Sequence, residues 1–467
     1  MKICLIAPPS VRIRYNISGV YPLPPLGLAY IAAVLENANY KVEIIDMVVS
    51  KMSLKQLEGY LRTRDFDFFG LSCNVFNLKC GIEIAHLIKK VNSEAVVILG
   101  GRCAAFPPED IFAYCSALDV IVHGEGEATM LDLCNLFKNN GSSLDGLGKI
   151  SGISFRKGSE VTRTNKREFI DLNSLPLPAR HLLPNKKYRM HPPFGLYPPV
   201  AILETSRGCK YKCSFCGLSS LPRERSVPGI IFEINELIIK YNAREIHFVD
   251  PNFTYNHERL KLLCNQLIDK NIKIPWSCKT RVDLVTPDLL KLMKRSGCYM
   301  ISYGVESSRQ DVLDGFNKEI STGHTVKAFG WTRENKIRTI AYVILGYLKE
   351  DGHSIKQLTN FINRINPDFV LYNEFFYIPG TPIVEQNISE GKLSYRDLLD
   401  FYISGKSINI SRIKFTKYLN IANRSFYFRI SYVLSRLVQI KNLQDLVNMF
   451  KGFKYFIMDK IRLKHIF

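Results

Sequence analysis

Long apolar runs are absent from this sequence of 467 residues. A membrane-spanning helix needs about 18 or more consecutive apolar residues, and no run in the chain reaches that length. The first residues, Met1 to Ile6, lead straight into a strand pattern and do not resemble a signal peptide. These absences predict a folded cytoplasmic protein, and the chain is long enough for two or three domains.

Densely spaced cysteines, which mark small secreted disulfide scaffolds, are also absent. The 12 cysteines are scattered along the chain, which favours reduced thiols in a reducing compartment. Internal repeats, low-complexity tracts, helix-turn-helix patterns and zinc-finger spacings are missing as well. The net charge of +20 therefore indicates a solvated basic surface, and no nucleic-acid partner is expected.

The first 140 residues alternate short apolar runs with helical patterns, which is typical of a parallel sheet covered by helices on both faces. This predicts a doubly wound, Rossmann-like α/β domain over residues 1–140. Five strands are expected, at 2–7, 41–46, 68–73, 95–99 and 119–122.

Ligands of such domains bind at the carboxyl ends of the strands. Tight turns are the alternative explanation for the glycine pairs in these loops. The residues expected at a binding edge are Pro8, Pro9, Ser72, Asn74, Gly100, Gly101, Gly124, Glu125 and Gly126.

A second repeating pattern follows a linker. Residues 141–199 contain a hairpin pattern and a proline-rich passage, which are typical of a connection between domains. Over residues 200–385, six strand patterns alternate with helical ones and predict a partial (β/α)6 barrel, related to the eightfold barrel, with its site at the carboxyl ends of the strands. Residues 386–467 are basic with intermixed aromatic residues, and their pattern predicts a helical region.

Three cysteines, Cys209, Cys213 and Cys216, follow the first barrel strand with C-x3-C-x2-C spacing. Thiolates suit zinc or an iron–sulfur cluster. A structural zinc site needs four protein ligands, but no Cys or His follows Cys216 until His247, which falls within another expected strand. Three thiolates leave one iron of a [4Fe-4S] cluster open to an amino acid that carries a sulfonium. An incomplete zinc ribbon and chance cysteines in a loop are the alternatives.

The cysteine loop, with Phe215 directly before its last cysteine, resembles the signature of the radical S-adenosylmethionine (SAM) superfamily, whose core is a partial barrel of six strand–helix units. The resemblance implies a [4Fe-4S] cluster on the three cysteines, reductive cleavage of SAM, and an electron donor such as flavodoxin or ferredoxin. After the fifth strand, the family's Pro-Gly turn is missing from the segment that begins at Gly346. The positions that match SAM-binding segments of the family are Phe215, Asp250, Asn252, Gly304, Glu306 and Gly346.

The segment from Pro24 to Tyr30, with the helix and strand after it, is similar to the opening of cobalamin-binding domains fused to such barrels. The glycines after the fourth and fifth strands stand where those domains have their corrinoid loops. Relatives that ligate cobalt through histidine carry it shortly after the second strand, but Asp46 is followed here by Met-Val-Val-Ser. The resemblance therefore implies a cobalamin whose lower face no such histidine ligates. A domain that has lost the cofactor is the alternative.

Taken together, the resemblance implies a class B methyltransferase-like enzyme. The expected reaction is cobalamin-dependent methyl transfer to an unactivated carbon of a small-molecule or lipid-like substrate. Radical oxidation, cyclisation or rearrangement without methyl transfer is a second hypothesis, and a corrinoid- or redox-sensing binding protein is a third. The basic stretch Lys451 to Phe467 is expected to pack on the barrel mouth, with peripheral membrane contact as the alternative.

Overall fold

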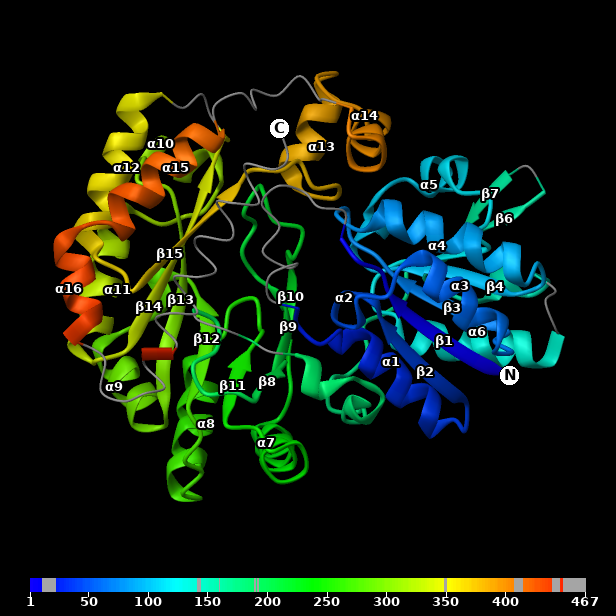
Figure 1. Ribbon diagram of the computed structural model, residues 1–467, viewed down its shortest axis with the longest axis horizontal. Coiled ribbons are helices and arrows are strands. Elements are labelled where there is room, and N and C mark those ends of the chain that lie inside the picture. The colour runs from blue at the N-terminus through cyan, green and yellow to red at the C-terminus, as the bar shows by residue number, and fades with distance from the viewer. Residues whose placement is uncertain are drawn as a thin grey trace. The chain divides into compact units, whose positions relative to one another are not determined.

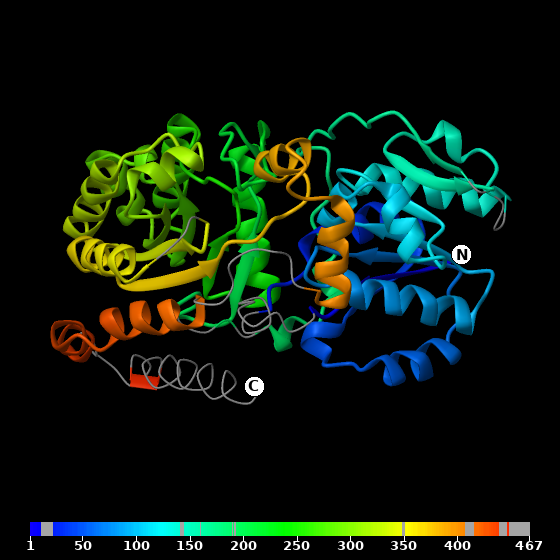
Figure 2. The same cartoon turned by 90° about the horizontal axis from the view of Figure 1, so that it is seen from above.

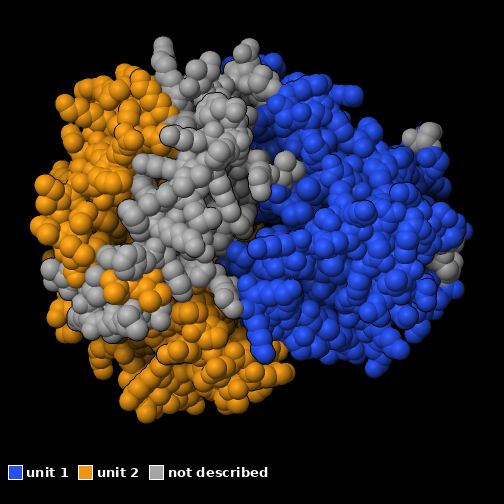
Figure 3. Space-filling model, in the orientation of Figure 1, with its two compact units in different colours: residues 1–188, 377–408 blue, residues 189–376, 409–467 orange. Residues whose placement is uncertain are grey.

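The computed structural model of the chain (Figures 1 and 2) describes residues 1–10, 22–140, 144–158, 160–188, 190, 193–347, 351–406, 415–438 and 446–447. The chain divides into two compact units (Figure 3). Unit 1 comprises residues 1–188 and 377–408, and unit 2 comprises residues 189–376 and 409–467. The boundaries of the four segments expected from the sequence stay a prediction.

Unit 1 is built on a seven-stranded sheet with the order β2-β1-β3-β4-β5-β6-β7. The first five strands in the chain are parallel, and β6 and β7 join antiparallel at the β5 edge. The hairpin that the sequence pattern placed in a linker thus extends the sheet and covers an otherwise open edge. The strands are β1 (Lys2–Ala7), β2 (Lys41–Asp46), β3 (Phe68–Ser72), β4 (Val96–Gly100), β5 (Val120–Val122), β6 (Ile153–Lys157) and β7 (Glu160–Arg163).

Helices cover both faces of this sheet, as expected of a doubly wound domain. On one face, apolar residues of α1 (Leu26–Asn37) and α6 (Glu127–Asn140) form a core with side chains of the parallel strands. The other face carries helices that include α3 (Leu54–Arg62) and α4 (Leu78–Val91), which pack on each other. The short helices α2 (Met47–Ser50) and α5 (Pro108–Tyr114) follow β2 and β4.

Residues 377–408 return to unit 1 after the last strand of unit 2. They contain α13 (Pro382–Ser389) and α14 (Tyr395–Leu399). The Tyr114 hydroxyl donates a hydrogen bond to Asp400, and the rings of Phe76 and Tyr402 meet edge to face at 5.9 Å between centroids. These contacts attach the returning segment to α5 and to the loop after β3.

Unit 2 contains a six-stranded parallel sheet in which the strands follow one another in chain order. This confirms the predicted partial barrel. Its helices lie along the outer side of the strands (Figure 1). The strands are β8 (Val200–Leu203), β11 (Glu245–Phe248), β12 (Trp276–Thr280), β13 (Cys298–Glu306), β14 (Arg338–Leu345) and β15 (Phe369–Glu374). The helices after them are α7 (Val227–Tyr241), α8 (His257–Asp269), α9 (Pro287–Arg295), α10 (Gln310–Gly315), α11 (Thr322–Glu334) and α12 (Gly352–Ile365).

Two further features complete unit 2. An antiparallel ribbon of β9 (Ser206–Cys209) and β10 (Ser220–Glu224) brackets the cysteine loop, and the sequence pattern did not predict it. The expected C-terminal helices are present as α15 (Phe415–Tyr427) and α16 (Ile430–Val438). The stretch Lys451 to Phe467 lies outside the described residues. Across the described part of the chain, every helix is too short or too polar to cross a membrane.

Candidate functional site

The cysteine loop starts at the carboxyl end of β8, where Asp250 holds its first residues. The buried Asp250 carboxylate accepts hydrogen bonds from the backbone N–H of Thr205 (3.1 Å), the Thr205 hydroxyl (2.7 Å) and the Ser206 hydroxyl. Burial raises the pKa of Asp250, and these hydrogen bonds lower it. Asp250 therefore fixes the entry to the loop, and its contact with SAM stays a prediction.

The far side of the loop is tied to the turn after α10. The backbone N–H of Ser214 donates to the carbonyl of Phe316 (2.8 Å), and the Asn317 side-chain amide donates to the carbonyl of Lys212 (3.0 Å). Within this frame Cys213 is buried, Cys209 and Cys216 are half-buried, and none of the three forms a disulfide. The loop thus presents three cysteine side chains on a backbone that is fixed from two sides.

Arg281, which follows β12, brings a positive charge to this loop. Its Nη1 lies 3.9 Å from the Sγ of Cys213, and its guanidinium lies 3.6 Å from the ring centroid of Tyr211. Asp283 holds it with two bonds, Nε to Oδ1 at 2.9 Å and Nη2 to Oδ2 at 3.0 Å. The sequence reasoning missed Arg281, although its place after a barrel strand was a signal that could have identified it.

The second nearby cation is Lys318, which forms a buried ion pair with Glu306 at 2.8 Å. Glu306 adopts φ = 59°, a left-handed conformation that is uncommon outside glycine and often marks functional sites. Gly304 permits this arrangement, because a Cβ there would lie 2.8 Å from Lys318 Nζ. Burial raises the pKa of the Cys213 thiol, and the charges of Lys318 and Arg281 lower it.

Asn252 presents a buried hydrogen-bond donor that has no partner. Its Oδ1 accepts a hydrogen bond from the Thr280 hydroxyl (2.7 Å), but its Nδ2 is buried and unsatisfied. A buried polar group in this state costs about 1–3 kcal/mol unless a ligand satisfies it. Phe215, the residue before the last cysteine, packs edge to face on Phe316 at 4.8 Å between centroids.

These residues fit the expected cluster and the SAM molecule that would bind to it. Three thiols beside two cations suit a group that carries negative charge when thiolates bind it. The free Nδ2 of Asn252 and the carboxylate of Glu306 supply a donor and an acceptor of the kind that a nucleoside-linked amino acid needs. Among the described residues, no three His, Cys, Asp or Glu side chains converge on a point that could hold one metal ion.

Unit 1 brings the predicted cobalamin-binding residues to the carboxyl ends of its parallel strands. The loops after β1 and β3 are joined, because the Asn77 side-chain amide donates to the carbonyl of Pro8 (3.1 Å) and the Asn74 N–H donates to Asn77 Oδ1 (2.6 Å). Strand β1 lies between β2 and β3, so these loops flank the position where the strand order reverses, which is the usual ligand crevice.

The other predicted loops of unit 1 lie at the carboxyl ends of their strands. Ser72 ends β3, Gly100 ends β4 and Gly101 follows it, and Glu125 and Gly126 precede α6. Gly124 is exposed with φ = 78°, and no heavy atom lies within 4 Å of the position a Cβ would take. Such open backbone fits the close approach of a large cofactor.

Asp46, at the end of β2, is engaged within the protein. It accepts hydrogen bonds from the N–H of Val48 (2.9 Å) and the hydroxyl of Tyr188 (2.8 Å), and it caps α2. Burial raises the pKa of Asp46. The segment after β2 therefore supplies neither a histidine nor a free carboxylate to a cobalt ion.

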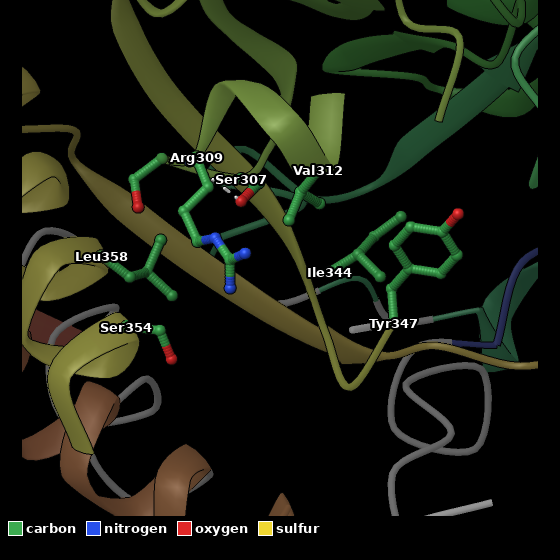
Figure 4. A pocket seen from close by; sticks show the side chains of 8 residues that line it. Ser307, Arg309, Val312, Ile344, Tyr347, Ser354 and Leu358 are labelled. Atoms are coloured by element: carbon green, nitrogen blue, oxygen red, sulfur yellow. Dashed lines mark hydrogen bonds between the residues drawn. The ribbon is translucent and has the colours of Figure 1, made fainter. Parts of the chain in front are cut away.

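A small hollow in unit 2 borders the expected SAM segments (Figure 4). It lies between the segment after β13, the end of β14 and the start of α12, and the three cysteines do not line it. Residues 348–350 of the segment after Gly346 lie outside the described residues. The lining residues are Ser307, Ser308, Arg309, Val312, Ile344, Tyr347, Ser354 and Leu358.

Two protein families match this chain. Residues 15–133 match the B12 binding domain, and residues 203–362 match the Radical SAM superfamily. The first match covers most of the doubly wound sheet, and the second covers the cysteine loop with most of the partial barrel.

Several known proteins are similar to most of this chain. An uncharacterized methyltransferase from Pyrococcus horikoshii is 28% identical over 92% of this chain and 93% of its own length. The anaerobic magnesium-protoporphyrin IX monomethyl ester cyclase of Cereibacter sphaeroides is 27% identical over 83% of this chain and 63% of its own length. The solved structure of the radical S-adenosylmethionine methyltransferase TsrM from Kitasatospora setae has a TM-score of 0.69 at 16% identity, over 84% of this chain and 76% of that chain, which shows a common fold.

Proposed function

Because the chain belongs to the radical SAM enzymes that carry an N-terminal B12-binding domain, we propose that it transfers a methyl group to an unactivated carbon of a small-molecule or lipid-like substrate. Its cofactors are a [4Fe-4S] cluster, SAM and cobalamin. The observation that carries the proposal is the loop of three cysteines, none of them in a disulfide, at the carboxyl end of β8, where Arg281 lies beside Cys213.

In this proposal, each group of residues has a defined task. Cys209, Cys213 and Cys216 hold the cluster, and Arg281 positions the loop and balances its charge. Asn252 and Glu306 orient SAM through the unsatisfied Nδ2 and the buried carboxylate. When bound, the cluster supplies the electron that cleaves SAM, and cobalamin supplies the methyl group.

The exposed loops of unit 1 hold cobalamin in the proposal. Gly124 lets the corrinoid approach the backbone at the carboxyl end of β5, and the joined loops after β1 and β3 form the neighbouring part of the edge. Asp46 serves α2 and Tyr188 instead of the cobalt. The segment after β2 would thus contribute no ligand to the cobalt.

Two kinds of relative support two reactions. The similarity to a methyltransferase extends over nearly the full length of both proteins and favours methyl transfer. The similarity to a cyclase keeps a ring closure without methyl transfer as the second candidate. The mass of the product separates them, because methylation adds one methylene unit and ring closure or oxidation removes two hydrogens.

The first experiment tests the radical chemistry itself. The anaerobically reconstituted protein is incubated with SAM and dithionite, and 5'-deoxyadenosine and methionine are quantified. We expect cleavage by the loaded protein and none by the protein without iron. Failure of the loaded protein to cleave SAM would contradict the proposal.

The second experiment tests the electron donor and the product. Reduced flavodoxin or ferredoxin replaces dithionite, and small molecules extracted from the source cells are added together with SAM carrying a deuterated methyl group. We expect a product that gains the labelled methyl group only when both hydroxocobalamin and SAM are present. A product that loses two hydrogens and carries no label would establish the second candidate instead.

The cytoplasmic location of the protein stays a prediction.

A further inference from the structure

Strand β12 presents a lysine to the inner face of the barrel sheet. The side chains of this strand alternate between two faces. On the outer face, Trp276 Nε1 donates to the carbonyl of Ser296 (2.9 Å), directly after α9, and Cys278 lies near Cys264 of α8. Ser277 and Lys279 therefore point to the opposite, inner face, away from the helices.

The surroundings of Lys279 are polar but carry little charge that could neutralise it. On the neighbouring strand β11, His247 Nδ1 is bonded to the Ser277 hydroxyl at 2.8 Å. Burial and the nearby charge of Lys279 lower the pKa of His247 to about 3, so this ring is neutral at physiological pH. On the other side, Lys279 pairs in register with Ser302 of β13.

The amine of Lys279 has no partner among the described residues. Within the part of the chain that the structure describes, no carboxylate forms an ion pair with Lys279 and no hydrogen bond involves its Nζ. Asp250 acts on it electrostatically, but the carboxylate of Asp250 is already occupied by Thr205 and Ser206. Burial lowers the pKa of Lys279, and Asp250 raises it. The side chain is nevertheless only half-buried, so a ligand has access to part of it.

An unpaired lysine at such a place is unfavourable for folding. A lysine ammonium is normally solvated or paired, and one that loses part of its water without gaining an anion destabilises the protein. Groups whose pKa is shifted by burial often occur at functional sites. Lys279 also precedes Arg281 by two residues on the same face, so the Cα atoms of the two residues lie about 7 Å apart along the strand. Arg281 in turn lies beside Cys213.

We propose that Lys279 binds an anionic group of the substrate, a carboxylate or a phosphoryl group, and so anchors the substrate on the inner face of the barrel beneath the cysteine loop. This inference rests on the proposed function, because it assigns Lys279 to the substrate of that reaction. It narrows the substrate class to molecules that carry such an anion. SAM carries a carboxylate too, so the test must separate the two sources.

The first test follows the reactivity of the amine. The anaerobic holoenzyme with SAM bound is amidinated with methyl acetimidate, which releases only methanol, in a buffer free of phosphate and carboxylate, and modified lysines are quantified by mass spectrometry. Acetate and methylphosphonate serve as anionic probes and acetamide as the neutral one. We expect at least one anion to lower amidination of Lys279 by about threefold or more, since an ion pair both covers the amine and keeps it protonated. Acetamide should leave it unchanged.

Lys294 is the matched control within the same protein. Burial lowers the pKa of Lys294 as well, but its Nζ donates to the carbonyl of Lys336 (2.8 Å) and it lies on α9 outside the sheet. Amidination of Lys294 should not respond to either anion. Absence of protection at Lys279 by both anions, or equal protection by acetamide, would overturn the proposal.

The second test separates the substrate from SAM. The affinity of Lys279→Met for SAM is measured by calorimetry on the loaded protein, and we expect it to stay within about twofold of the wild type. A loss of about tenfold or more would assign Lys279 to the SAM carboxylate and overturn the proposal. Lys279→Gln is measured alongside in case the methionine variant folds poorly.

Both tests measure binding and not turnover. If the wild-type protein fails to cleave SAM but its Lys279 is protected by anions, the proposed function fails and the anion site stands. If SAM is cleaved normally and Lys279 shows no protection, the anion site fails and the proposed function stands.

Discussion

The guanidinium of Arg281 lies 3.9 Å from the sulfur of Cys213, and this contact joins the third strand of the barrel to the loop at the end of the first. Asp283 and the carbonyl of Lys318 hold the guanidinium in place. Arg281 is therefore a positioning residue for the cysteine loop, which makes it the first target for mutation.

Replacing Arg281 with methionine should leave the three thiols in place but remove the charge beside Cys213. Partners that orient the ligands of a metal centre typically contribute about 10- to 100-fold to metal affinity or activity. We expect a loss of that size in the rate of SAM cleavage and a lower reduction potential, because the positive charge favours the reduced cluster. Spectroscopic redox titration measures the potential. Arg281→Lys should recover part of the shift, and an unchanged potential in both variants would contradict the electrostatic role.

Replacing any one of Cys209, Cys213 and Cys216 with alanine should abolish SAM cleavage. The fall in iron content and activity should exceed about 100-fold, since a lost ligand matters more than a lost orienting partner. Cys264→Ala is the control, because Cys264 is buried in α8 away from the loop. It should cost on the order of 1 kcal/mol in unfolding free energy and keep the cluster. Iron and sulfide analysis after reconstitution decides the outcome.

The Glu306–Lys318 pair allows ligand binding and stability to be separated. Glu306→Gln leaves the buried Lys318 without its anion, and breaking a buried pair in this way costs about 3–5 kcal/mol. We expect lower thermal stability together with weaker SAM binding. The double variant Glu306→Gln with Lys318→Met should regain stability but not SAM affinity. Recovery of both would show that Glu306 acts on the fold alone.

Gly124 and Gly158 make a matched pair for testing cobalamin binding. Both have positive φ, and neither has a heavy atom within 4 Å of a Cβ position. A leucine at either site should therefore bring a similar backbone penalty of about 1–2 kcal/mol. Only Gly124 lies at the carboxyl end of β5, so only Gly124→Leu should lose hydroxocobalamin. Equal retention by both variants, measured by absorbance after desalting, would place the cofactor elsewhere.

The sequence determined the repeating architecture and the cysteine loop. Strand and helix periodicity depends on local residue patterns, so the five parallel strands of unit 1 and the six strands of the barrel could be predicted to within a few residues. The spacing of Cys209, Cys213 and Cys216 is likewise a local property. The sequence pattern also predicted the hairpin of β6 and β7. Its attachment to β5 could not be predicted, because it depends on which edge of the parallel sheet remains open in the folded domain.

Only the tertiary structure decided which distant side chains meet. The contact of Asp250 with SAM stays a prediction, but its hydrogen bonds with Thr205 and Ser206, some 45 residues earlier, appear only in the folded chain. Arg281 reaches Cys213 across 68 residues, which no local pattern encodes. Lys279 became informative for the same reason, because a lysine in a strand looks solvent-exposed in the sequence. Whether it faces water or the inner side of a sheet depends on how strands and helices pack together.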